Sequence, residues 1–206
     1  MIKFKKSVSD RVSEFGAAVD LRIKPDFERI NRKYPPEKIM LIGLKEEKLL
    51  EVWIADGTNN FQKLKTYPVL KMSGVSGPKL KEGDRQVPEG FYRIEALNPN
   101  SLFHLALRLN YPNEFDCEKA KEEGRQNPGS DIMIHGSDRS VGCLAMGDEA
   151  IEEIFVLAAE TGIENISVLL SPMDFRVKEI ASVFSVSPSW VVELYAGIKK
   201  EMMKFR

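Results

Sequence analysis

The chain has 206 residues, which suits one domain with a substantial core and a small addition. Its 30 Lys and Arg residues balance its 31 Asp and Glu residues, so there is no general electrostatic case for binding nucleic acid or an anionic membrane. Two cysteines are too few for a disulfide framework, and with two histidines at these spacings they do not resemble a zinc site. We therefore expect no metal and no cofactor.

The first ten residues include the basic residues of a secretory signal, but no apolar stretch follows them. No apolar run approaches the ~18 residues that a membrane-spanning helix needs. We therefore expect no membrane span. The protein is expected to be cytoplasmic as the sequence is written, or periplasmic or in the cell envelope if a leader has been removed.

Residues 7–33 have helical periodicity, because apolar side chains recur at intervals of three and four among charged ones. Pro25 divides this segment, and Tyr34-Pro35-Pro36 ends it. The pattern favours a pair of helices packed on the domain over a helix that binds a membrane or a partner. We assign residues 1–36 to an N-terminal helical extension.

From residue 38 the period changes to two, which is typical of strands. Pro68 indicates an edge strand or a bulge. The long glycine-rich segment at 73–90 is not a phosphate loop, because no Gly-Lys-Ser/Thr follows its glycines. The runs that predict strands lie at 39–42, 50–54, 61–72, 91–97 and 103–109, with a polar hairpin loop at 45–48 and a turn at 56–60.

Residues 110–130 contain several Gly, Pro and Asn residues around a charged run, which indicates a long loop that is either functional or disordered. Further on, Asp148 is the expected N-cap of a helix that ends at Gly162. A last strand follows at 166–170, and residues 177–205 indicate two helices broken at Ser187-Pro188. The predicted fold class is mainly β (α+β), with helices at both ends of the chain.

The segment 132–146 is the most informative part of the chain. An apolar strand ends in His135, a short polar loop follows, and Ser-x-Gly precedes Cys143. An imidazole that takes the proton of a nearby thiol makes the sulfur a strong nucleophile, so the pair predicts catalysis. The alternative is a buried structural cysteine beside an unrelated histidine. Gly136 and Gly142 favour catalysis, because they permit unusual backbone shapes beside the two reactive side chains.

These residues resemble a known family. The His-Gly … Ser-x-Gly-Cys pattern resembles the L,D-transpeptidase catalytic domain, or YkuD-like fold, whose members act on bacterial peptidoglycan through a cysteine acyl-enzyme. The Gly-Pro, Gly-Asp and Pro-Glu-Gly-Phe-Tyr elements within 73–92 are similar to the same family. Residues 142–146, followed by an acidic helix start, resemble its YafK-like branch. The similarity covers about residues 36–176.

The resemblance implies a YkuD-like β-sandwich with a helix after the cysteine, at residues 37–172, between helical extensions at 1–36 and 173–206. It implies that Cys143 is the nucleophile and His135 the general base, whose ring is oriented by the carbonyl of Gly136. The segment 110–130 would be a capping loop over the site. We expect the backbone N–H groups of Gly142 and Cys143 to stabilise the oxyanion.

Four further residues are candidates for binding substrate. Ser140 is expected to brace the turn or to touch substrate. Arg139 is expected to bind a substrate carboxylate or to be a solvated loop residue. Tyr111 and Asn113 are candidates for lining the cleft beneath the capping loop.

Other polar residues have weaker claims to a role. Lys79 and Lys81 are candidates for contacting acidic stem peptides, with a solvated surface as the alternative. We expect His104 to be a partly exposed strand residue rather than a second base. Cys117, in a strongly charged segment, is expected to be a spectator thiol.

Two departures from the common family pattern bear on the reaction. Val141 stands where many members have a second histidine, and Ala145 where they have an arginine. The YafK-like branch shares both departures and includes hydrolytic members. The resemblance therefore favours hydrolysis of stem peptides, by an L,D-carboxypeptidase or amidase, over a transpeptidase that forms cross-links.

The alternative from another class is a non-catalytic module that binds cell-wall peptide or a partner protein. The intact cysteine and histidine argue against it, because a binding module needs neither. The expected partners are peptidoglycan stem peptides or muropeptides, not nucleic acid, and the oligomeric state stays open.

Overall fold

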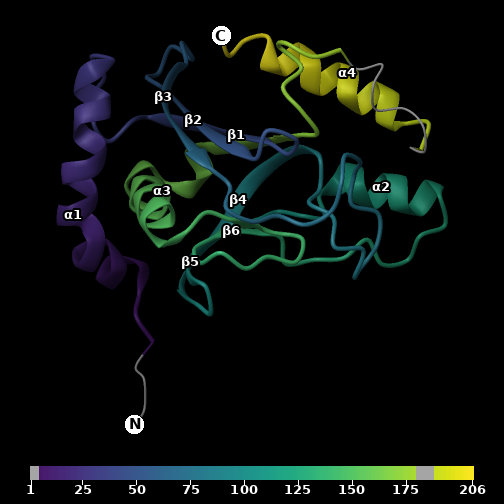
Figure 1. Ribbon diagram of the computed structural model, residues 1–206, viewed down its shortest axis with the longest axis horizontal. Coiled ribbons are helices and arrows are strands. Elements are labelled where there is room, and N and C mark those ends of the chain that lie inside the picture. Colours follow the sequence, from purple (N-terminus) through teal and green to yellow (C-terminus); the bar gives the residue numbers. More distant parts are fainter. Residues whose placement is uncertain (1–4, 180–187) are drawn as a thin grey trace.

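The computed structural model describes residues 5–179 and 188–206 of the chain (Figure 1). Within these residues, eight strands and four α-helices form an α+β fold, which confirms the expected class. No helix in the described part of the chain is long and apolar enough to cross a membrane. The elements, in chain order, are α1 (Val8–Arg29), β1 (Lys38–Leu44), β2 (Leu49–Ala55), β3 (Gln62–Pro68), β4 (Gly90–Ser101), β5 (His104–Leu109), α2 (Glu114–Glu122), β6 (Met133–His135), β7 (Leu144–Ala145), α3 (Asp148–Thr161), a short 3₁₀ helix (Ile163–Asn165), β8 (Ile166–Ser171) and α4 (Val191–Met202).

The strands are ordered β3-β2-β1-β8-β4-β5-β6-β7. The pairs β1–β8 and β6–β7 are parallel, and the other pairs are antiparallel. The long strand β4 joins two halves of the sheet, because residues 90–93 pair with β8 and later residues pair with β5. Both halves contribute side chains to one hydrophobic core, as expected for a sandwich. β3 lies at the edge of the sheet, one of the two alternatives that Pro68 indicated, and it ends at Pro68 and not at residue 72 as predicted.

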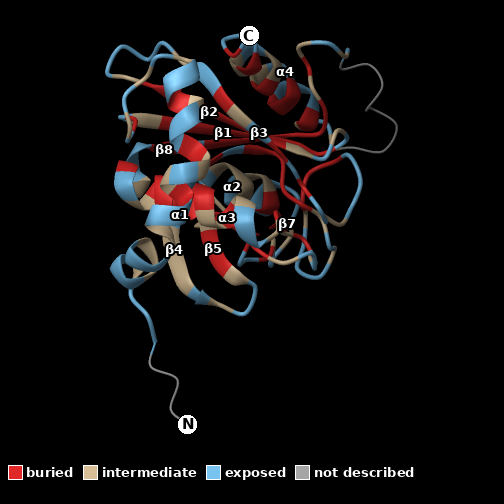
Figure 2. Cartoon of the chain, turned by 60° about the vertical axis from the view of Figure 1, so that its left-hand side comes forward, coloured by how far each residue is buried: buried red, intermediate tan, exposed pale blue. Residues whose placement is uncertain are grey.

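Strand β1 is buried on both faces, which explains its continuous apolar sequence. Ile39 and Leu41 face the main core, together with the inner sides of α1 and α3. Met40 and Ile42 face the opposite side, where α4 covers the sheet. Figure 2 shows the buried residues gathered in the strands and on the sides of the helices that face them, while the outer side of α1 is exposed.

The helix α1 runs without a break through Pro25, so the predicted pair of helices is wrong. A capping box between Ser7 and Asp10 begins the helix. Buried residues lie on both sides of the proline, with Ile23 before it and Phe27 after it. Because both turns pack on the same core, their burial maintains the helix despite the hydrogen bond that proline cannot form.

Part of the predicted loop at 110–130 is helical. The side chain of Asn113 accepts a hydrogen bond from the N–H of Asp116 at 3.0 Å, and the Asp116 carboxylate accepts one from the N–H of Asn113 at 3.0 Å. This capping box begins α2. Only Ala120 in α2 is buried, so the helix has too little apolar periodicity to be predicted from its pattern.

The N-cap of the helix after the cysteine lies one residue earlier than predicted. Its N-cap is Gly147, and Asp148 is the first helical residue. The Asp148 carboxylate instead accepts a hydrogen bond from the N–H of Ser137 at 2.8 Å, which ties the helix to the loop after His135. The helix is followed by Gly162, as predicted, with φ of 86°.

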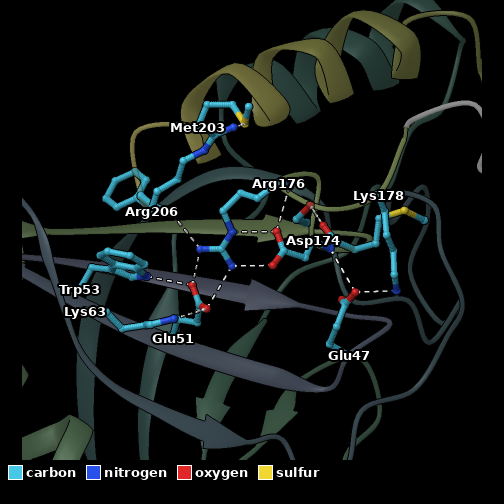
Figure 3. Close-up of polar contacts among 12 residues, drawn as sticks. Glu47, Glu51, Trp53, Lys63, Asp174, Arg176, Lys178, Met203 and Arg206 are labelled. Atoms are coloured by element: carbon cyan, nitrogen blue, oxygen red, sulfur yellow. Dashed lines mark hydrogen bonds and ion pairs between the residues drawn. The ribbon is translucent and has the colours of Figure 1, made fainter.

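The C-terminal region is fastened to β2 by Arg176 (Figure 3). Its guanidinium donates to both carboxylate oxygens of Glu51 at 2.9 and 3.0 Å, and to both of Asp174 at 2.7 and 2.8 Å. The second of the two predicted C-terminal helices is α4. Most of the segment predicted to form the first, residues 180–187, lies outside the described residues.

Candidate active site

Strand pairing brings the segments that carry His135 and Cys143 side by side. β6 and β7 run parallel, with Ile134 opposite Leu144 and His135 opposite Ala145. Cys143 directly precedes β7, and its sulfur lies 3.4 Å from the backbone nitrogen of Met133 on β6. Ile134 and Leu144 are buried in the main core. The imidazole and the thiol therefore come from adjoining segments of the chain in the fold.

The imidazole of His135 is held in one orientation. Its Nδ1 lies 2.6 Å from the carbonyl oxygen of Gly136, as the sequence analysis expected. Because a carbonyl only accepts, Nδ1 carries the proton, and in the neutral ring Nε2 has the lone pair. Burial lowers the pKa of His135, which favours that neutral ring. The ring of Phe103 stacks on the imidazole with a centroid distance of 4.7 Å.

Gly136 is required by close approach of its neighbours. A Cβ at this position would lie 2.7 Å from both the Asp148 carboxylate and the carbonyl oxygen of Phe103. Gly142 has a different reason to be glycine, because its φ is 87°, in the region that other residues rarely adopt. Both glycines beside the reactive pair are thus explained, but only Gly142 by its backbone angle.

The thiol of Cys143 contacts two backbone groups. It donates to the carbonyl of Asp131 at 3.6 Å, and its sulfur accepts from the N–H of Met133 at 3.4 Å. Burial raises the pKa of Cys143, so the thiolate is disfavoured. Within residues 5–179 and 188–206, no hydrogen bond joins this thiol to His135. The directions of both pKa shifts favour a neutral thiol and a neutral imidazole in the resting pair.

The two N–H groups expected to bind an oxyanion each have a serine hydroxyl as partner. The N–H of Gly142 donates to Ser73 at 2.7 Å, and that of Cys143 donates to Ser140 at 3.0 Å. The Ser140 hydroxyl also donates to the carbonyl of Cys143, so it braces the turn. Ser73 comes from the glycine-rich loop, and the sequence analysis did not find it because it lies 69 residues away.

The glycine-rich loop that carries Ser73 is anchored by a buried ion pair. The ammonium of Lys45 lies 2.7 Å from Glu89 and donates to the carbonyls of Gly77 and Val87, each at 2.9 Å. Lys45 is therefore not the solvated hairpin residue that its charged neighbours suggested. Desolvation lowers its pKa, but the three acceptors satisfy all three of its protons.

Several candidate residues have structural contacts. The Tyr111 hydroxyl donates to the carbonyl of Pro128 at 2.8 Å, and the Asn113 amide donates to that of Phe91 at 2.9 Å. Both Tyr111 and Asn113 line a groove beside α2, so their expected roles as substrate contacts stay predictions. Lys79 is buried and pairs with Asp84 at 2.7 Å.

The remaining candidates lie at the surface. Arg139 is exposed in the loop before Cys143, and Lys81 is exposed as well. His104 lies 2.9 Å from Glu152 and is partly exposed, and Cys117 is exposed on α2. Across the described ranges, no group of three His, Cys, Asp or Glu side chains could hold a metal ion.

The fold and the neighbouring cysteine and histidine point to one family. The L,D-transpeptidase catalytic domain (YkuD) matches residues 37–166, and the chain belongs to this family. It is 38% identical over 113 residues to the Escherichia coli strain K12 protein named "Putative L,D-transpeptidase YafK". That match covers 54% of this chain and 43% of the relative, so it spans less than half of the relative's length. The resemblance to the YafK-like branch is thereby confirmed.

A solved structure supports the fold. The chain is similar to the helical cell shape determining protein Pgp2 from Campylobacter jejuni, with a TM-score of 0.53 and 24% identity. The match covers 68% of this chain and 50% of Pgp2. At this level of identity, the likeness concerns the fold.

Proposed function

We propose that this protein is a cysteine hydrolase of peptidoglycan stem peptides, an L,D-carboxypeptidase or amidase. Family membership supports the substrate class. The observation that carries the reaction type is the orientation of His135, because its Nδ1 is bound by the Gly136 carbonyl and Nε2 is left with the lone pair of a general base. The sulfur of Cys143 lies 3.4 Å from the backbone nitrogen of Met133, two residues before His135 on β6.

In the proposed reaction, Cys143 attacks the carbonyl carbon of a bond between an L-centre and a D-centre. His135 takes the thiol proton as the carbon–sulfur bond forms, and the carbonyl electrons move to oxygen. Collapse of the intermediate expels the amine, which takes the proton from the imidazolium and leaves a thioester. Water then attacks the thioester and gives a proton to His135, which returns it to the departing sulfur.

Two rearrangements prepare the resting site for this reaction. The thiol must leave the carbonyl of Asp131 before His135 takes its proton. The oxyanion must replace the hydroxyls of Ser73 and Ser140 as the acceptor for the N–H groups of Gly142 and Cys143. Both break neutral hydrogen bonds, each worth about 0.5–1.5 kcal/mol net, so substrate binding energy suffices to drive them.

Hydrolysis is favoured over transfer by the character of the residue two positions after the cysteine. Ala145 is buried and carries no charge, so this position offers no cation to hold the carboxylate of an incoming acceptor. Without a held amine, water is the nucleophile that resolves the thioester.

The test is incubation with purified tetrapeptide muropeptides, with and without a D-amino acid or second stem as acceptor, and identification of products by mass. Tripeptide or released-peptide products support the proposal. Abundant cross-links or exchanged D-amino acids with little hydrolysis would establish a transpeptidase instead. A wild-type protein that binds muropeptides but yields neither kind of product would be a binding module.

A further inference from the structure

The C-terminal helix α4 reaches the glycine-rich loop through one buried hydroxyl. This helix lies beyond residues 37–166, the part of the chain that matches the family. The hydroxyl of Tyr195 donates to one carboxylate oxygen of Glu89 at 2.5 Å. Tyr195 is fully buried, and Glu89 is 1% exposed. A helix outside the matched domain is therefore joined to the loop by a hydrogen bond that water does not reach.

The other carboxylate oxygen of Glu89 holds the loop itself. It accepts from the N–H of Gly77 at 2.8 Å and from the ammonium of Lys45 at 2.7 Å. Lys45 in turn donates to the carbonyls of Gly77 and Val87, which belong to the two opposite sides of the loop. The cluster of Tyr195, Glu89 and Lys45 therefore fixes the glycine-rich loop on both of its sides.

Both sides of the loop also contact the turn that carries Cys143. On one side, the hydroxyl of Ser73 accepts from the N–H of Gly142 at 2.7 Å. On the other side, the carbonyl oxygen of Gln86 is close enough to lie 3.4 Å from a Cβ placed on Gly142. The position of the loop therefore determines the surroundings of Gly142, whose N–H is one of the two expected oxyanion donors.

We propose that Tyr195 is a positioning residue, which acts through Glu89 and the glycine-rich loop to hold the N–H of Gly142 where the oxyanion forms. This inference deepens the proposed function and rests on it. An oxyanion donor is most effective when it is already aimed at the developing charge, because it then needs no reorganisation during the reaction. The loop holds the turn through Gln86 as well as through the Ser73 hydroxyl, so the cluster controls more than that one hydrogen bond.

The test is Tyr195→Phe, which removes the hydroxyl and keeps the ring in the core. Complete loss of one oxyanion donor costs about 10²–10³ in kcat, so we expect displacement of the loop to lower kcat for muropeptide hydrolysis by about fivefold to tenfold. KM should stay within about twofold, because the N–H acts in the transition state. Steady-state kinetics corrected for the folded fraction measures both. A merely structural role would leave kcat per folded molecule unchanged.

Amide hydrogen exchange followed by NMR gives a second measurement, which needs no turnover. Loss of the Tyr195 hydroxyl should loosen the loop without unfolding the domain. Exchange at the N–H groups of Gly77 and Gly142 should then become about fivefold faster, the effect of one lost hydrogen bond on local opening. The melting temperature shows that the variant is folded.

Tyr67→Phe is the matched control. The hydroxyl of Tyr67 donates to the buried carboxylate of Glu153 at 2.7 Å, and the ammonium of Lys65 lies 2.7 Å from the same carboxylate. These residues join β3 to α3, so the substitution removes the same kind of hydrogen bond from another part of the core. We expect kcat per folded molecule and the exchange rate at Gly142 to stay at their wild-type values.

An unchanged kcat per folded molecule in Tyr195→Phe would overturn the inference. So would wild-type exchange at Gly142 in that variant, or an equal loss of kcat in Tyr67→Phe. Failure of the proposed function gives a different result. A wild-type protein that does not hydrolyse muropeptides, but in which Tyr195→Phe speeds exchange at Gly142, would refute the function and keep the link from α4 to the turn.

Discussion

The turn that carries Cys143 and the C-terminal segment that carries Arg176 are held by different kinds of hydrogen bond. Around Arg176, four hydrogen bonds between charged groups of 2.7–3.0 Å join a guanidinium to two carboxylates (Figure 3). Around Cys143, the backbone N–H groups bond to two serine hydroxyls, and the thiol bonds to a carbonyl. The first set is charged and largely buried, and the second is neutral.

The difference indicates which contacts a substrate can displace. Breaking a buried ion pair leaves an uncompensated charge, which costs about 3–5 kcal/mol, so the Arg176 cluster serves the fold. A neutral hydrogen bond contributes about 1 kcal/mol net, and a substrate carbonyl can take the place of a hydroxyl at little cost. A substrate can therefore displace the neutral hydrogen bonds around Cys143, whereas the ion pairs of Arg176 stay intact and maintain the fold.

The strongest test on the site side is Cys143→Ala. Removal of the sulfur should reduce muropeptide turnover to background, because no acyl-enzyme can form, while the melting temperature stays near that of the wild type. Intact-mass analysis of products measures this. Cys117→Ala is the matched control, since that thiol is exposed on α2, and it should retain full activity. A greater loss in the control would mean that the wrong thiol was assigned.

His135→Ala should lower the rate at neutral pH by about 10²–10⁴-fold, the usual contribution of a general base. Part of the rate should return at high pH, where the thiol ionises unaided. Steady-state kinetics across pH measures both effects. The comparison variant is His104→Ala, whose ring lies 2.9 Å from Glu152, and this substitution should change the rate much less. If His104→Ala were the more damaging, the reactive pair would have to be reassigned.

On the scaffold side, Arg176→Met should destabilise the protein by about 3–5 kcal/mol, because Glu51 and Asp174 remain as neighbouring buried charges. Denaturant unfolding measures this, and kcat per folded molecule should be unchanged. Lys178→Met removes a more exposed partner of Glu46 and Glu47, and it should hardly change the denaturant concentration at the midpoint of unfolding. A large drop in kcat with little loss of stability would contradict the division between scaffold and site.

The reactivity of the resting thiol gives a sharper test. Burial raises the pKa of Cys143, so alkylation by iodoacetamide should still be rising, by up to about tenfold per pH unit, at pH 9. Peptide mapping after short exposures separates this adduct from one at Cys117. A rate that levels off near pH 7 would instead show a thiolate–imidazolium pair at rest.

Much of the fold is predictable because its signals are local. The alternation in β5 and the apolar stripe of α3 follow from deeper burial of one face, which imposes a period on neighbouring residues. The unbroken α1 was not predictable, because the proline penalty is visible in the sequence while the packing of Ile23 and Phe27 is not. Helix α2 was missed because a capping box, not burial, begins it.

The candidate site likewise has some residues that the sequence predicts and others that it does not. Cys143, His135 and the Gly136 carbonyl lie within nine residues, so spacing and resemblance suffice to find them. Ser73 contacts Gly142 across 69 residues, and no local pattern signals such a contact. Lys45 and Glu89 form their ion pair across 44 residues, which no local pattern signals either. Contacts between residues that are far apart in the sequence can be identified only from the structure.

The smallest expected effect comes from Ser73→Ala. The hydroxyl accepts from the N–H of Gly142 and donates to the carbonyl of Arg85, both at 2.7 Å, so its loss should cost about 0.5–1.5 kcal/mol of stability. If that hydroxyl only occupies the N–H until the oxyanion replaces it, kcat should change by less than about threefold, because the N–H is still present in the transition state. Measuring kcat and the unfolding midpoint on the same preparation separates the two effects.

Thr58→Ala, which removes a hydroxyl bonded to Asp56 far from Cys143 in sequence, controls for loss of a hydroxyl alone. A fall in kcat of a hundredfold would show that Ser73 acts on the substrate itself, and the contacts around Cys143 would then not be exchangeable in the way the comparison with Arg176 requires.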